Sequence, residues 1–134
     1  MTTMPQFDNI RLYIYLYYYK EGALLARHNL ELYALKAELC KTFADAKRLI
    51  IIEELRAGET TVGELARILE FPQAVVSRNL AILRDKGVVQ FRREGTSVYY
   101  SLSDPKIGDA CEMVHQILLD QMEKNRALAE RLVA

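Results

Sequence analysis

The fold of this chain is decided by one stretch, Gln73-Ala74-Val75-Val76-Ser77-Arg78-Asn79-Leu80-Ala81-Ile82-Leu83-Arg84-Asp85-Lys86. Its apolar residues Val76, Leu80 and Leu83 recur at helical spacing, which predicts a helix with one face packed inward. The other face of this helix is predicted to be polar and to carry Gln73, Ser77, Arg78, Asn79 and Arg84. Side chains of these types donate to phosphates or meet base edges, so we expect a recognition helix for nucleic acid.

A second helix is predicted directly before this stretch, over residues 62–69. Only Glu70-Phe71-Pro72 separates the two helices. Two helices joined by so short a turn are typical of a helix-turn-helix motif. In that motif the second helix lies in the major groove of DNA.

A β-hairpin is predicted directly after the recognition helix. Residues 88–93 and 97–102 are rich in β-branched and aromatic side chains, and Glu94-Gly95-Thr96 between them has the composition of a turn. A hairpin in this position is a wing. We expect Arg92 and Arg93, beside its tip, to reach DNA phosphates or a minor groove.

Several motifs, taken in order, resemble the ArsR family of winged helix-turn-helix repressors. They are residues 38–49, 76–80, 92–95 and 98–100, and the resemblance covers about residues 31–120. The resemblance implies a mainly α fold with a small β-hairpin wing. It also implies a homodimer formed through the first and last helices, and repression of a promoter by operator binding.

Two residues in the turn depart from the family pattern. Glu70 stands where the family usually has glycine, and we expect it to take a left-handed backbone conformation at some cost. Pro72 replaces the usual serine cap of the recognition helix. Proline suits the first turn of a helix, where its missing N–H is not needed, so we expect the turn to form.

The N-terminal part of the chain lies outside the resemblance. Residues 1–22 form a tyrosine-rich extension, with a stretch at residues 10–19 that is too short to span a membrane. An extra helix, a strand paired with a partner subunit and an exposed adhesive segment are the alternatives, and a packing role is favoured. Residues 23–134 are predicted to form the winged helix-turn-helix domain with its N- and C-terminal dimerisation helices.

Both terminal helices of that domain carry apolar seams. The last helix is predicted to begin at Asp104 as its cap, with Pro105 at its first position, and to run to about Arg131. A single winged domain leaves nothing to cover these seams, so we expect a two-fold dimer that buries each against its partner. The first seam is Leu25, His28, Leu32, Leu35, Leu39 and Phe43, and the second is Ile107, Cys111, Val114, Leu118 and Met122.

Between the first seam and the helix-turn-helix motif, another helix is predicted over residues 46–56, with Asp45 as its N-cap and Gly58 at its end. Leu49, Ile52 and Leu55 are expected to face the core from this helix. A short strand is expected at about residues 61–62, directly before the helix-turn-helix motif.

Composition narrows the class of protein. The formal net charge is zero, so no overall basicity indicates nucleic acid, although basic residues gather between positions 78 and 93. An alternative left open is therefore a winged protein-interaction module without DNA binding. No apolar run reaches the roughly 18 residues of a membrane span, and two cysteines without a signal peptide favour a reducing cytoplasm.

The two cysteines are the strongest candidates for a signal site. Cys40 and Cys111 lie on the first and last predicted helices, which should meet at the dimer interface. There they could form a disulfide or a persulfide bridge, or bind a soft metal. The alternative is that both are small buried apolar side chains. Thiol-switch relatives place their first cysteine on the following helix, so Cys40 departs from that pattern.

Metal-binding and catalytic motifs are not expected. The arsenic-type pattern of the family places cysteines in the first helix of the motif, where residues 62–69 have none. The zinc-type pattern begins with an aspartate like Asp104, but Lys106 stands where its first histidine would be, and His115 is out of spacing. No phosphate-binding glycine loop is present either, so we predict no enzyme, no resident cofactor and no metal site apart from the soft metal that the two cysteines could bind.

The prediction is therefore a dimeric, cytoplasmic DNA-binding repressor that recognises an inverted-repeat operator and is released by a metal or a thiol-reactive signal. Gln73, Ser77, Arg78 and Asn79 are expected in the major groove, with Gln73 and Asn79 reading base edges. The residues expected to hold phosphates or the flanking minor groove are Arg84, Arg92, Arg93 and Thr96.

Overall fold

The structure is a computed structural model in which residues 30–134 are described. The tyrosine-rich extension of residues 1–22 lies outside the described residues, as do residues 23–29 of the first predicted helix. The chain divides into two units, the first ending at Phe43 and the second running from Ala44 to Ala134. The predicted domain boundary at residue 22 stays a prediction.

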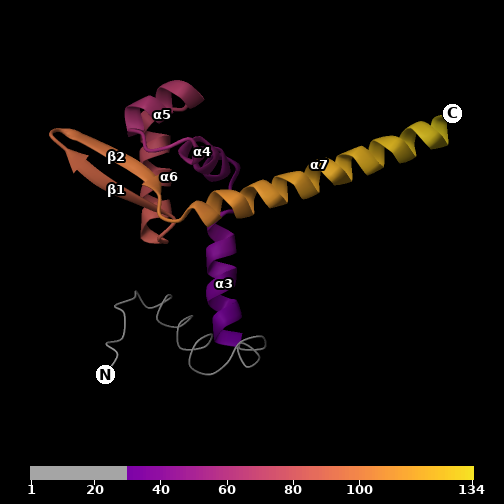
Figure 1. Cartoon of the computed structure of the whole chain (residues 1–134), viewed down its shortest axis with the longest axis horizontal. Helices are drawn as coiled ribbons and strands as arrows, with labels where there is room; N and C mark the ends of the chain where they lie inside the picture. The colour runs from indigo at the N-terminus through magenta and orange to yellow at the C-terminus, as the bar shows by residue number, and fades with distance from the viewer. Residues whose placement is uncertain (1–29) are drawn as a thin grey trace. The chain divides into compact units, whose positions relative to one another are not determined.

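Helix α3 (Leu30–Thr42) is the described element of the first unit (Figure 1). The second unit has the predicted order of elements, so a mainly α fold with a small β-hairpin wing is confirmed. Its elements are α4 (Ala46–Arg56), α5 (Val62–Leu69), α6 (Gln73–Asp85), β1 (Val89–Glu94), β2 (Ser97–Leu102) and α7 (Pro105–Val133).

Short polar side chains determine where the helices begin. The Asp45 side chain accepts a hydrogen bond from the Arg48 N–H at 3.1 Å, and the Asp104 side chain accepts one from the Lys106 N–H at 2.9 Å. Both were predicted caps, and Pro105 is the first residue of α7 as expected. Thr61 caps α5 by accepting from the Glu64 N–H at 3.2 Å. Each cap satisfies a backbone donor that has no partner inside its helix.

A small apolar core holds α4, α5, α6 and the base of the hairpin together. On α4 the buried stripe runs through Ile51, Ile52 and Leu55, so the prediction that Leu49 faces this core is wrong; Leu49 is 40% exposed. The buried face is centred about Ile51, and Leu49 lies two residues away, round the side of the helix. The fully or nearly buried apolar residues are Ile51, Ile52, Leu55, Leu65, Val76, Leu80, Leu83, Val88 and Val89.

The hairpin is attached to the rest of the unit along β2. Strands β1 and β2 pair antiparallel, and Gly95 makes the turn with a φ of 61° that favours glycine. On the other edge of β2, Thr60 and Tyr100 exchange both backbone hydrogen bonds, at 3.0 and 2.7 Å. The short strand expected at residues 61–62 is thus a single bridge one residue earlier. Thr60, in the loop between α4 and α5, therefore attaches the wing to the segment that leads into the helix-turn-helix motif.

Helix α7 packs its first turns on α4. Gly108 is buried, and a Cβ atom placed there would lie 2.6 Å from Cγ of Arg56. The Arg56 guanidinium donates to Glu53 on its own helix and to Glu112 on α7, at 3.2 Å in each case. Beyond this contact α7 continues away from the core, with large apolar side chains exposed (Figure 1).

Candidate nucleic-acid interface

The polar face of α6 is exposed as predicted. Gln73, Ser77 and Arg84 lie along one side of the helix, at spacings that bring them above one another, and Arg78 lies beside them. All four side chains are exposed, whereas Val76, Leu80 and Leu83, on the side of the helix next to this row, are buried. A helix held by its apolar side in this way presents its polar side to a partner.

Asn79 is not part of this face, and its predicted exposure is wrong. The residue is only 5% exposed, and its side-chain N–H donates to the Val75 carbonyl at 2.9 Å. Three residues after Val76 and one before Leu80, it falls on the buried side of the helix. Its amide is satisfied by the turn before it, as a buried polar group requires.

Two alanines complete the exposed side of α6 and were not singled out from the sequence. Ala74 and Ala81 are exposed between the polar side chains. Small side chains allow a helix to approach the floor of a groove, and an alanine methyl can contact the methyl group of thymine. Their spacing from Gln73 and Ser77, one and four residues, was the signal that could have identified them.

The turn before α6 forms despite its unusual residues. Glu70 takes the left-handed conformation expected of it, with φ 55° and ψ 36°, and the following N–H, of Phe71, donates to the Ala66 carbonyl. Pro72 is the N-cap of α6, the position at which it replaces the usual serine, and it provides no side-chain hydrogen bond. The N-terminal N–H groups of α6 therefore lack a side-chain acceptor at the cap.

Two arginines, one on α6 and one on the wing, lie near the same aromatic ring. The exposed ring of Phe91 on β1 has the Arg84 guanidinium 5.3 Å and the Arg93 guanidinium 5.7 Å from its centroid. Arg84 belongs to α6 and Arg93 to the wing, so Phe91 joins the two elements in one basic group. Cations over an aromatic face are attracted by its quadrupole, which holds both charges at the surface. Thr96 is exposed in the turn of the hairpin.

Arg92 lies in a different environment from Arg93. Successive residues of a strand point to opposite faces, so Arg92 leaves the Phe91–Arg93 side of the hairpin. Its guanidinium donates to Glu59 and to Glu94, each with a contact at 2.8 Å. Glu59 is the partner that the sequence does not indicate, because it precedes the helix-turn-helix motif.

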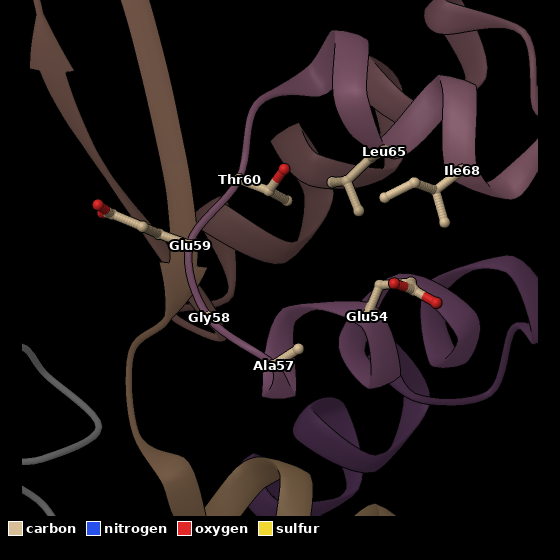
Figure 2. Close-up of a pocket in the computed structure, with 7 residues that line it drawn as sticks. All are labelled: Glu54, Ala57, Gly58, Glu59, Thr60, Leu65 and Ile68. Atoms are coloured by element: carbon tan, nitrogen blue, oxygen red, sulfur yellow. The ribbon is translucent and has the colours of Figure 1, made fainter.

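A small open pocket of about 150 Å³ lies between α4, α5 and the loop that joins them. Figure 2 shows Leu65, Ile68 and Glu54 turned toward it, while the Glu59 side chain points away, toward the strands of the hairpin. None of the pocket residues is on the exposed side of α6, so the pocket is separate from the candidate interface.

The two cysteines differ in environment. Cys40 on α3 is exposed, so the alternative of a buried apolar role does not hold for it in the single chain. Cys111 on α7 is half-buried; burial raises the pKa of its thiol, the Glu53 carboxylate adds to this, and Arg56 opposes it. Among residues 30–134, no three His, Cys, Asp or Glu side chains gather into a group that could hold a metal ion. In the same range, no helix has the length and apolar character needed to cross a membrane.

Known proteins resemble this chain both in fold and in sequence. A family model described as "Bacterial regulatory protein, arsR family" matches residues 45–90. The transcriptional activator HlyU of Vibrio cholerae is 36% identical over 100 residues, covering 74% of this chain and 93% of that protein. Its reduced form superposes with a TM-score of 0.59 at 36% identity, over 65% of this chain and 92% of that one.

Two further relatives are a transcriptional repressor and a homodimeric DNA-binding domain. The transcriptional repressor PagR of Bacillus anthracis is 36% identical over 93 residues, covering 67% of this chain and 93% of that protein. The homodimeric winged helix-turn-helix DNA-binding domain of Mb0332 from Mycobacterium bovis has a TM-score of 0.64 and 29% identity, over 70% of this chain and 87% of that one. The matches span the core, the recognition helix and the wing together, so this chain belongs to the ArsR family and is a winged helix-turn-helix, DNA-binding transcriptional regulator.

Proposed function

We propose that this protein is a repressor that binds an inverted-repeat operator as a homodimer. The observation that carries the proposal is the exposed polar side of α6 beside the Arg84–Phe91–Arg93 group. Two such surfaces related by a two-fold axis would meet half-sites about 34–36 Å apart, one turn of DNA. The repressor PagR supports this direction of regulation, although HlyU is named an activator.

The residues divide into two roles. Gln73 lies at the N-terminus of α6, where recognition helices contact base edges, and its amide suits adenine. Ser77 lies one turn further along the same side, with Arg78 beside it, and the two complete the proposed major-groove surface. Arg84 and Arg93 provide paired charges for the phosphate backbone, and Thr96 provides a hydroxyl at the tip of the wing.

Dimerisation would cover the exposed part of α7. Val114, Leu118 and Met122 continue the stripe that starts with Ile107, and each is more than half exposed in the single chain. So many large apolar side chains along one helix mark an interaction surface in a soluble protein. The homodimeric relative Mb0332 supports a second copy as the partner.

The thiols are the proposed site of release. Cys40 is exposed and would react first with an oxidant, a persulfide donor or a soft metal, whereas the raised pKa of Cys111 slows its reaction. Serine at each position should leave DNA binding intact and remove the response to oxidant, polysulfide or arsenite. If both variants respond like the parent protein, the thiols are not the switch.

DNA binding tests the main proposal directly. Fluorescence anisotropy with a labelled fragment from upstream of the protein's own gene, over a salt series, should give a steep loss of affinity as salt rises. A scrambled fragment of equal length is the control, and the affinity for it should be lower by about a thousandfold or more. In vitro transcription from the same promoter should fall when the protein is added. Equal affinity for both fragments, or increased transcription, would contradict an operator-specific repressor.

A further inference from the structure

We infer that Arg92 is a positioning residue that latches the wing, through Glu59, to the loop leading into the helix-turn-helix motif, and is not a phosphate ligand. The sequence alone places Arg92 and Arg93 in one basic pair. The structure separates them onto opposite faces of the hairpin, with different partners. The expected effect of this contact on operator affinity rests on the proposed function, in which the wing contacts DNA. The structural role of Arg92 does not.

The latch is built across three adjacent segments. The Arg92 guanidinium donates to both carboxylate oxygens of Glu59, at 2.8 and 2.5 Å, in the planar two-bond geometry that arginine makes with a carboxylate. On the way it crosses the ring of Tyr99, 4.5 Å from the centroid. Tyr99 is the residue opposite Arg92 in the register of β1 and β2, so these two side chains share one face of the hairpin, and Glu59 of the α4–α5 loop binds Arg92 there.

The backbone next to Glu59 is the other half of the attachment. Thr60 exchanges two hydrogen bonds with Tyr100, and Figure 2 shows the Glu59 side chain directed toward the hairpin. The ion pair therefore lies beside the only backbone pairing that joins the wing to the α4–α5 loop within residues 30–134. Holding that pairing keeps the wing at a set position relative to α5 and α6.

Charge balance argues against a phosphate contact by Arg92. Glu59 and Glu94 both bind its guanidinium, so the group of three carries a net negative charge. The hydrogen bonds from Arg92 lower the pKa of the Glu59 carboxyl, which stays ionised at neutral pH. Phosphate would have to approach two carboxylates to reach Arg92. Arg93, by contrast, has no ion pair with a carboxylate of residues 30–134 and is left with its charge uncompensated.

The two adjacent arginines provide a matched comparison. Arg92→Gln and Glu59→Gln should each weaken operator binding by up to about fivefold, the range of an exposed ion pair, and the double variant should be no weaker than either. The slope of log affinity against log salt should be unchanged in all three. Arg93→Gln should lower that slope by about 0.9, the value for one phosphate contact. The charge-swapped pair Glu59→Arg with Arg92→Glu should recover most of the lost affinity.

Amide hydrogen exchange gives a measurement that does not depend on DNA. Protection of the Thr60 and Tyr100 amides should fall by up to about fivefold in Arg92→Gln and in Glu59→Gln, and remain unchanged in Arg93→Gln. Were Arg92→Gln to lower the salt slope by about one while Glu59→Gln strengthened binding, Arg92 would be a phosphate ligand and the latch would be refuted. Unchanged protection of both amides in the two latch variants would also refute it. A parent protein that binds no DNA would remove the proposed function and leave the exchange result to decide the latch.

Discussion

Glu70 shows at the scale of one residue how this chain departs from the usual helix-turn-helix turn. Its φ of 55° is the only positive value at a non-glycine position among residues 30–134. For amino acids other than glycine, the left-handed backbone conformation costs roughly 1–2 kcal/mol, because Cβ approaches the following carbonyl oxygen. The turn forms nevertheless, because Leu65 and Leu80 are fully buried on the helices to either side of it.

Replacing Glu70 with glycine should therefore stabilise the protein. Removing the Cβ relieves the backbone cost, and the greater freedom of glycine in the unfolded chain offsets part of it. We expect the free energy of unfolding to rise by about 0.5–1 kcal/mol, measured by urea denaturation. Glu70→Ala keeps the Cβ and is the control; equal gains in the two variants would show that the side chain, and not the backbone, was the cause.

Arg78 tests the recognition face at the same scale. It is exposed beside Ser77 and has no carboxylate partner among residues 30–134, so its charge is available to DNA. Arg78→Ala should weaken operator binding and lower the salt slope by about one if the side chain meets a phosphate. Arg126→Ala is the control, since Arg126 already pairs with Glu123 on α7. A loss of slope in both variants would indicate a non-specific effect of net charge.

At the scale of elements, the contact between α4 and α7 depends on a glycine. Gly108 lets α7 approach the Arg56 side chain, which binds Glu53 and Glu112 on the two helices. Helix interiors ordinarily favour alanine over glycine by about 1 kcal/mol. The presence of glycine in α7 is therefore explained by close packing and not by helix propensity.

Gly108→Ala should separate these two effects. In the parent protein the new methyl group overlaps Arg56, and we expect the melting temperature to fall, because overpacking costs about 1–3 kcal/mol. In an Arg56→Ala background the overlap is gone, and the same substitution should raise the melting temperature through helix propensity. The comparison is a double-mutant cycle measured by thermal unfolding. A stabilising effect of similar size in both backgrounds would show that Arg56 does not restrict this site.

At the scale of the whole molecule, the exposed stripe of α7 makes the proposed dimer testable. Leu118→Asp puts a charge into the stripe and should give a monomer at micromolar concentration in analytical ultracentrifugation. Because one recognition helix then binds alone, operator affinity should fall by more than about tenfold. Ala127→Asp introduces the same charge on the opposite side of α7, nine residues on, and should leave both properties unchanged. A dimeric Leu118→Asp variant would place the interface elsewhere.

Much of the fold could be predicted because its determinants are local. Asp45 and Asp104 cap helices by accepting hydrogen bonds from backbone N–H groups three and two residues further along the chain. The spacing of Val76, Leu80 and Leu83 identifies the buried side of α6 without reference to the rest of the chain. The candidate site was harder. Asn79 looks like a base-reading residue by type, yet its position between Val76 and Leu80 puts it on the packed side.

Periodicity, caps and turn residues act over a few positions, so the residues alone are enough to predict the order of the elements, the helix-turn-helix motif, the wing and the family. Which polar side chains remain available for a partner depends on how the folded chain brings distant residues together. Arg92 and Arg93 are chemically identical neighbours, but Arg92 finds Glu59, 33 positions away, because the hairpin folds back beside the loop after α4. Such a pairing depends on the three-dimensional path of the chain, which no local pattern of residues records.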